Sequence, residues 1–201
     1  SILANAKTPM IYAGGGVLRG NAWAELQQLA ELLEAPVVMS ANGKGAISDR
    51  HYLAQNQVCE LDIRPGADVA LIVGTRFLDN LSQPRPMNPD TVLIRIDIDE
   101  EEIARDLTPN IQLLGDAKAG LAGLIERLAS TAGNRPSRKD ELQAIKDAAN
   151  VRIFGMSPQG EFGRAMREAV PDDGIFVGEM TQLAYWSNFG MPIYQPNTYI
   201  T

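Results

Sequence analysis

The chain has 201 residues, 45% of them hydrophobic and 21% charged, which is ordinary for a globular protein and enough for one domain and part of a second. The formal net charge of −7 makes nucleic acid an unfavourable partner, because an acidic chain repels phosphate backbones. No apolar run in the sequence reaches the roughly 18 to 20 residues of a membrane-spanning helix, so we expect no membrane segment.

Cysteine and histidine each occur once, which limits the chemistry that the side chains can perform. The only cysteine, Cys59, excludes an intramolecular disulfide and fits a cytoplasmic location. It has no CxxC partner, and we interpret it as a packing residue rather than a nucleophile. The only histidine, His51, is likewise interpreted as a surface or packing residue, so neither a histidine triad nor a metal site is expected. No carboxylate pair has a placement typical of a general acid and base, and we predict no catalytic residue.

Short apolar runs alternate with helical patterns along the first 130 residues. The first run, 10–13, ends in three glycines, and apolar residues at helical spacing then predict a helix over 23–33. A second helix is predicted over 117–129. Further strands are predicted at 36–39, 69–73, 92–96 and 111–114. These strands are apolar on both faces, which indicates a doubly wound, Rossmann-like α/β fold with a parallel sheet and helices on both of its faces.

A candidate linker and further predicted elements follow the first 130 residues. A polar stretch with Gly and Pro at 130–139 is the best linker candidate, and a helical stretch follows at 140–150. Ser157 is predicted to be the N-cap of another helix with Pro158 in its first turn, and a strand is predicted at 174–178. We therefore expect a central, nucleotide-binding-like domain at 1–130, a linker with a helix at 131–156, and a truncated second α/β segment at 157–201.

Several loops that follow the predicted strands carry candidate binding residues. The amides of Gly14–Gly16 either approach a pyrophosphate or form only a tight turn, and the segment does not match GxGxxG because Arg19 stands at the third position. The loop Asn42–Gly45 either contacts a phosphate through its amides or the Lys44 ammonium, or is a surface turn. Arg76 either forks onto a phosphate or carboxylate or is simply solvated.

The segment Asp97–Asp99 ends the fourth predicted strand, where an acidic residue often hydrogen-bonds a ribose or an adenine amino group. Asp99 is favoured as the cap of a helix that begins with three glutamates at 100–102. The ligand role then falls to Asp97 or to the backbone of Ile98.

The ordered set of these segments carries a family resemblance. The set comprises PMIYAGGGV at 9–17, APVV at 35–38, GKG at 43–45, ADVALIVGTRF at 67–77, IDID at 96–99 and GD at 115–116. It resembles the central domain of the acetolactate synthase-like thiamine-diphosphate enzymes, and it covers nearly all of residues 1–130. The sequence GEMTQLAYW at 178–186 looks like the start of the family's diphosphate-binding domain. Thr181 and Gln182 are therefore candidate cofactor contacts, although Leu183 replaces the histidine of acetolactate synthases.

The resemblance implies a full-length parent that uses thiamine diphosphate and Mg²⁺ to act on a small 2-oxo acid, as a carboligase (transferase) or a decarboxylase (lyase). It also implies a homo-oligomer, either a dimer or a tetramer. The family's activating glutamate and its GDG metal motif would lie in flanking sequence. We therefore expect these 201 residues to be inactive by themselves and not to bind thiamine diphosphate and Mg²⁺ tightly.

In the central domain the resemblance implies an adenine nucleotide: FAD as in acetolactate synthases, ADP as in oxalyl-CoA decarboxylases, or none. The positions carried over are Gly15, Gly16, Asn42, Gly43, Arg76, Asp97 and Ile98. Leu78 and Asn80 depart from the GxRFDDR pattern of the FAD-binding members, which leaves the choice open. The alternative is a non-catalytic nucleotide-binding or oligomer-scaffolding module. An NAD-dependent oxidoreductase is disfavoured by the imperfect glycine motif and the lack of a catalytic His or Tyr-x-x-x-Lys.

Overall fold

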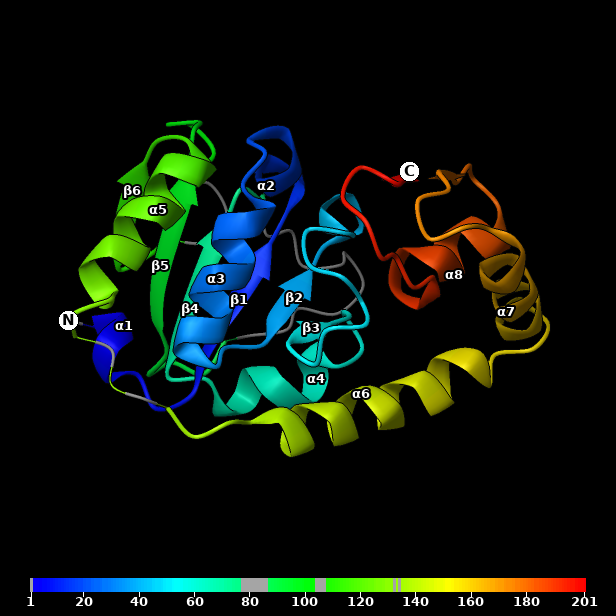
Figure 1. Ribbon diagram of the computed structural model, residues 1–201, viewed down its shortest axis with the longest axis horizontal. Helices are drawn as coiled ribbons and strands as arrows, with labels where there is room; N and C mark the ends of the chain where they lie inside the picture. The colour runs from blue at the N-terminus through cyan, green and yellow to red at the C-terminus, as the bar shows by residue number, and fades with distance from the viewer. Residues whose placement is uncertain (1, 77–86, 104–107, 132, 134) are drawn as a thin grey trace.

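The structure is a computed structural model that describes residues 2–76, 87–103, 108–131, 133 and 135–201. Its largest element is a six-stranded sheet in the order β3-β2-β1-β4-β5-β6, in which every neighbouring pair is parallel (Figure 1). The strands are β1 (Pro9–Ala13), β2 (Val37–Met39), β3 (Ala54–Gln55), β4 (Val69–Val73), β5 (Val92–Asp97) and β6 (Ile111–Leu114). The predicted doubly wound α/β fold is confirmed. Among the six strands of this sheet, the two-residue β3 is the one with no counterpart in the sequence prediction.

The centre of the sheet is apolar on both faces, as a parallel sheet covered by helices requires. All five residues of β1 and all five of β4 are buried, and each strand aligns with the other along its whole length. One charged residue interrupts this pattern, because Arg95 in the middle of β5 is only 1% exposed. The buried residues of these central strands are therefore apolar apart from one guanidinium on β5.

Helices α3 (Trp23–Leu33) and α5 (Ala117–Leu128) lie side by side against the sheet (Figure 1). In α3 the predicted apolar stripe is the buried one: Leu26, Leu29, Ala30 and Leu33 are all inaccessible to solvent. Asp116 caps α5, since its Oδ1 accepts a hydrogen bond of 3.0 Å from the Ala119 amide. The remaining short helices of this half are α1 (Ile2–Asn5), α2 (Gly15–Arg19), α4 (Glu60–Ile63) and the 3₁₀ turns η1 (Ala41–Gly43) and η2 (Arg64–Gly66).

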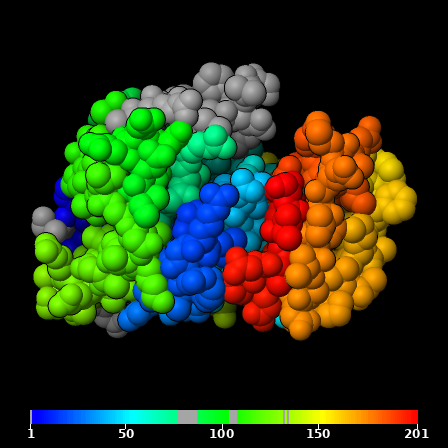
Figure 2. All heavy atoms as spheres, turned by 90° about the horizontal axis from the view of Figure 1, so that it is seen from above, coloured from blue at the N-terminus to red at the C-terminus, as the bar shows by residue number. Residues whose placement is uncertain are grey.

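The C-terminal third begins with α6 (Lys139–Phe154), which runs along the lower edge of the molecule (Figure 1). It continues with α7 (Gln159–Ala169), β7 (Phe176–Val177), α8 (Gln182–Gly190) and β8 (Tyr199–Ile200). The two short strands pair in parallel as a second sheet. In the view of Figure 2 the red C-terminal residues lie between the blue-to-cyan half of the chain and the orange helices. The predicted helix at 140–150 and the predicted strand at 174–178 are thus confirmed.

The predicted N-cap of α7 is wrong by one residue. Pro158 occupies the cap position, and the Ser157 hydroxyl instead hydrogen-bonds Glu161 Oε1 at 3.2 Å. The preceding backbone already supplies acceptors for the first turn, because the Gly160 amide donates to the Met156 carbonyl at 2.6 Å. A side-chain cap from Ser157 is therefore not needed.

The turn between β1 and α2 touches the end of β4 through backbone atoms alone. The Gly14 amide donates to the Val73 carbonyl at 3.0 Å, and the Gly16 amide donates to the Gly74 carbonyl at 2.9 Å. A Cβ added to Gly16 would lie 2.6 Å from the Gly74 Cα, and one added to Gly74 would lie 2.7 Å from the Gly16 Cα. Gly74 also has a φ of +54°, a conformation that side chains disfavour. Glycine is therefore required on both sides of this contact.

We expect Gly74→Ala to lower the free energy of unfolding by about 2–4 kcal/mol, because the new Cβ adds left-handed strain to a backbone clash. Urea unfolding followed by circular dichroism measures the change. The matched control is Gly123→Ala in the middle of α5, where an added Cβ meets no described atom within 4 Å. That variant should gain about 0.5–1 kcal/mol from helix propensity. Similar losses in both variants would contradict the proposed contact.

Candidate functional site

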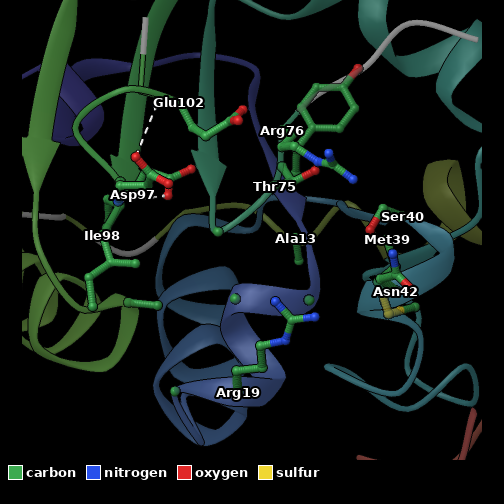
Figure 3. A pocket seen from close by; sticks show the side chains of 18 of the residues that line it. Ala13, Arg19, Met39, Ser40, Asn42, Thr75, Arg76, Asp97, Ile98 and Glu102 are labelled. Atoms are coloured by element: carbon green, nitrogen blue, oxygen red, sulfur yellow. Dashed lines mark hydrogen bonds between the residues drawn. The ribbon is translucent and has the colours of Figure 1, made fainter. Parts of the chain in front are cut away.

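A cleft of about 700 Å³ opens at the carboxyl ends of the parallel strands. It lies where the strand order reverses, between the β1-β2-β3 half and the β4-β5-β6 half, which is the usual ligand position in doubly wound sheets. Six of the seven predicted nucleotide-binding positions line it: Gly15, Gly16, Asn42, Arg76, Asp97 and Ile98. These residues come from four separate loops, so only the fold brings them together (Figure 3).

Gly43, the seventh position, does not line the cleft. It is buried in η1, and its amide donates to the Ser40 carbonyl at 2.9 Å. A Cβ on Gly43 would lie 2.3 Å from the Ala13 carbonyl oxygen. The structure therefore gives Gly43 a packing role, which is to let the loop after β2 press against the end of β1.

The glycine turn offers a ligand fewer amides than its sequence suggests. The Gly14 and Gly16 amides are already bonded to the end of β4. Among the described residues, the Gly15 amide is the one of the three that has no backbone acceptor. Attraction for an anion must therefore come mainly from side chains around the turn.

Charge is unevenly distributed along the cleft. Two exposed arginines, Arg19 in the last turn of α2 and Arg76 after β4, contribute positive charge to its middle. Figure 3 shows both guanidinium groups between the β5 end with Asp97 and the β2 end with Asn42. Four of the five acidic lining residues belong to the β5 and β6 loops, namely Asp97, Asp99, Glu102 and Asp116, and the fifth, Glu60, lies on α4. Arg19 was not predicted as a site residue, although a basic side chain soon after a glycine turn was a usable signal.

Asp97 is held in place by Arg95, the buried arginine of its own strand. Arg95 Nη2 donates to the Thr75 carbonyl at 3.0 Å and lies 3.4 Å from Asp97 Oδ2. The other carboxylate oxygen of Asp97 accepts a 3.3 Å hydrogen bond from the Asp99 amide. Arg95 therefore links the ends of β4 and β5. Arg95 was not predicted as a site residue from the sequence. The usable signal was an arginine inside an otherwise apolar strand.

Asp99 behaves as the predicted cap in the part of the loop that the structure describes. Its Oδ1 accepts hydrogen bonds from the amides of Glu101, at 2.9 Å, and Glu102, at 3.4 Å. These residues form a turn, and the continuation of the predicted helix at 104–107 lies outside the described residues. Asp99 also lines the cleft, so a cap role does not remove it from the site.

A buried polar network lines the β1 side of the cleft. The Tyr12 hydroxyl donates to Glu60 Oε1 at 2.7 Å, and Arg64 Nη1 donates to the same oxygen at 2.9 Å. Glu60 and Arg64 are 7% and 5% exposed. This charge pair compensates for the burial of each partner and holds the Glu60 carboxylate at the cleft wall. The sequence did not predict the network, because it depends on the four-residue α4.

The single cysteine and the single histidine both lie outside the cleft. Cys59 is fully buried, as predicted, and burial raises the pKa of its thiol. His51 Nε2 lies 3.2 Å from Glu31 Oε1, and its ring stacks on Tyr52, which also agrees with the prediction. Within the described ranges, no three His, Cys, Asp or Glu side chains cluster as metal ligands. Nor is any helix there long and apolar enough to cross a membrane.

Comparison with known proteins decides the family. Residues 1–124 match the family model described as "Thiamine pyrophosphate enzyme, central domain". The chain belongs to this family. The predicted resemblance to acetolactate synthase-like enzymes is thereby confirmed, and the cleft lies within the central domain that the family model matches.

Relatives in this family include three that show how much of each protein the chain represents. A probable acetolactate synthase large subunit of Methanococcus aeolicus is 37% identical over 134 residues, which are 63% of this chain and 22% of that protein. An acetolactate synthase of Mycobacterium leprae is 34% identical over 215 residues, covering 99% of this chain and 34% of that protein. A glyoxylate carboligase of Escherichia coli O157:H7 is 34% identical over 149 residues, covering 69% and 25%. The chain thus spans about a third or less of the length of the curated relatives it matches.

The other predicted cofactor contacts of this family member, Thr181 and Gln182, lie at the start of α8 and not in the cleft. Thr181 is the N-cap of α8, because its Oγ1 accepts from the Ala184 amide at 3.1 Å. Gln182 Oε1 accepts from Gln159 Nε2 at 2.8 Å. Their role toward thiamine diphosphate stays a prediction. The FAD-pattern positions Leu78 and Asn80 lie outside the described residues.

Cys59 should react slowly with thiol reagents in the folded protein. Because burial raises the pKa of its thiol, the thiolate fraction at pH 8 falls below that of a free cysteine, and access is blocked as well. We expect labelling by 5,5′-dithiobis(2-nitrobenzoate) to be on the order of 100-fold slower than in denaturant. Equal rates in native buffer and in denaturant would show that Cys59 is accessible and reactive.

Proposed function

We propose that this chain is part of a thiamine-diphosphate- and Mg²⁺-dependent enzyme that acts on a small 2-oxo acid, and that its cleft binds an adenine nucleotide, either FAD or ADP. The activities named for the relatives, acetolactate synthase and glyoxylate carboligase, support the first part, either as a carboligating transferase or as a decarboxylating lyase. The convergence of six predicted positions on one cleft supports the second part. A cytoplasmic homo-oligomer, dimer or tetramer, completes the proposal.

The arrangement of positive and negative side chains along the cleft fits a nucleoside diphosphate. Arg19 and Arg76 would hold the diphosphate, since guanidinium groups form paired, charge-assisted hydrogen bonds with phosphate oxygens. Asp97, fixed by Arg95, would accept hydrogen bonds from the ribose hydroxyls or the adenine amino group. Ile98 is 74% exposed beside it and offers an apolar surface for the base. The volume of about 700 Å³ lies within the usual range for small-molecule sites.

The two candidate nucleotides would use different lengths of the cleft. ADP needs only the stretch from the arginines to the β5 loop. FAD would also occupy the β1 and β2 side, which Tyr12, Asn42, Gln57 and Glu60 line. The buried Glu60–Arg64 pair keeps that wall polar and rigid. The second half of the cleft is therefore bounded by a defined protein surface.

Thiamine diphosphate, when bound, supplies an electron sink for the carbonyl carbon of the oxo acid. Thr181 and Gln182 are the positions of this chain proposed to contact its diphosphate. Both are exposed at the N-terminus of α8, where backbone amides favour an anion. The described residues contain no acidic cluster for Mg²⁺, and the proposal assigns none of them to the metal.

Isothermal titration calorimetry of the chain with FAD and with ADP tests the nucleotide proposal. We expect one of them to bind with micromolar affinity, and Arg76→Gln to weaken that binding by about 10- to 100-fold through the loss of charge-assisted hydrogen bonds. The matched control is Arg152→Gln on α6, an exposed arginine that pairs with Asp62 away from the cleft. No heat with either nucleotide, or equal affinities in both variants, would contradict the nucleotide site without affecting the enzyme assignment.

The enzyme assignment has its own test in the full-length protein that contains this chain. Release of carbon dioxide from pyruvate or glyoxylate should require both thiamine diphosphate and Mg²⁺, and excess EDTA should abolish it, because the metal anchors the cofactor diphosphate. Turnover that persists without added thiamine diphosphate, after dialysis against EDTA, would contradict the proposal. So would the absence of turnover with every 2-oxo acid tested.

A further inference from the structure

Two buried lysines face one small pocket on the side of the β2–β3 loop away from the nucleotide cleft. Lys44 follows η1 and is 4% exposed, and Lys146 on α6 is 8% exposed. The pocket has a volume of about 60 Å³ and shares no lining residue with the cleft. Its other lining residues are Asp49, Asn56, Asn150, Phe189, Gly190, Met191 and Pro192. The pocket therefore lies where four segments meet: the loop after β2, the start of the loop after β3, helix α6 and the end of α8.

Several hydrogen-bond donors line this pocket. Lys146 Nζ donates to the carbonyls of Asp49, at 3.1 Å, and His51, at 2.7 Å, which leaves one of its three N–H groups. Lys44 Nζ makes no hydrogen bond or ion pair with any described residue, and the Tyr199 ring centroid lies 5.7 Å from it. The Oδ1 of Asn56 already accepts from the Val58 and Cys59 amides, so this residue adds its NH₂ group as a further donor.

The charges around the pocket are also unbalanced. Asp49 is the one carboxylate that lines it, and its Oδ2 accepts a 2.7 Å hydrogen bond from the Ile193 amide. Burial lowers the pKa of both Lys44 and Lys146, while the negative charge of Asp49 offsets part of that effect in each. With both lysines protonated, two positive charges face one negative charge. Buried charges are usually paired, so a second anion would complete the site.

We propose that this pocket binds one small inorganic anion of the size of chloride, held between the ammonium groups of Lys44 and Lys146. Its volume is only about two water molecules, which excludes nucleotides and thiamine diphosphate. The two lysines lie on different segments, so the anion joins the loop after β2 to α6. It also lies beside the end of α8, where the Asp49 amide donates to the Ile193 carbonyl at 3.0 Å. The anion site thus fastens the C-terminal third to the six-stranded sheet.

The melting temperature of the chain, measured at constant ionic strength while chloride replaces gluconate, tests this site. Gluconate is too large for the pocket, so only chloride should stabilise the folded state by mass action. Above its dissociation constant, each tenfold increase in chloride should raise the melting temperature by about 3–5 °C. Lys44→Met should remove this dependence, because methionine keeps the apolar stem and loses the charge. Lys139→Met, at the exposed start of α6, should retain it.

A crystal grown in sodium bromide gives an independent measurement, since bromide scatters anomalously and fits a chloride site. We expect an anomalous peak within hydrogen-bonding distance of both Nζ atoms in the wild-type chain and none in Lys44→Met. A melting temperature that is independent of chloride, or an identical slope in the wild type and Lys44→Met, would overturn the proposal. Density for water without an anomalous signal would overturn it as well.

Discussion

The close contact between the Gly14–Gly16 turn and Gly74 is the constraint on which the rest of the site depends. It joins the ends of β1 and β4, the two strands between which the sheet reverses its order, and it leaves no room for side chains. Because the two backbones meet directly, no side chain fills the space above them. The two backbones therefore form the floor of the cleft. The same contact uses the amides of Gly14 and Gly16 as hydrogen-bond donors to the end of β4. These two amides therefore cannot donate to a ligand. Positive charge then has to come from Arg19 and Arg76.

The acidic side of the cleft depends on a buried arginine, whose burial costs more free energy than the glycine contact does. Burying the Arg95 guanidinium at 1% exposure is unfavourable unless its donors are satisfied, and Nε and Nη1 have no hydrogen-bond partner among the described residues. What the strand gains is a fixed position for Asp97, the last residue of β5, and for the Thr75 carbonyl, which follows the end of the neighbouring β4. A cleft that must present a carboxylate in one orientation has a reason to keep such a residue. A fold selected for stability alone would place an aliphatic side chain there.

The sequence predicted the parts of the molecule that repeat a simple pattern. The apolar runs of β1, β4 and β5 and the stripe of α3 are long enough to reveal their period, so their position and type were correct. β3 and α4 have only two and four residues, and the contacts that define them, such as Glu60 with Tyr12, come from residues 48 positions apart. Gly43 was carried over as a nucleotide-binding position from the family resemblance, whereas in the structure it packs against the Ala13 carbonyl. Local sequence cannot distinguish a glycine that approaches a ligand from one that approaches another strand.

The composition of 130–139 marks a boundary in the sequence that the packing does not follow. Arg135, in the middle of this polar stretch, donates hydrogen bonds to the carbonyls of Leu3, Ala4 and Ala6, so the stretch is held against the start of the chain. Farther on, Leu142, Ala149 and Ile153 of α6 belong to the same apolar core as the strands of the six-stranded sheet. The C-terminal third is therefore fastened along the whole length of α6. The position of Thr181 and Gln182 relative to the cleft follows from that contact, because α8 packs on α6 and α7.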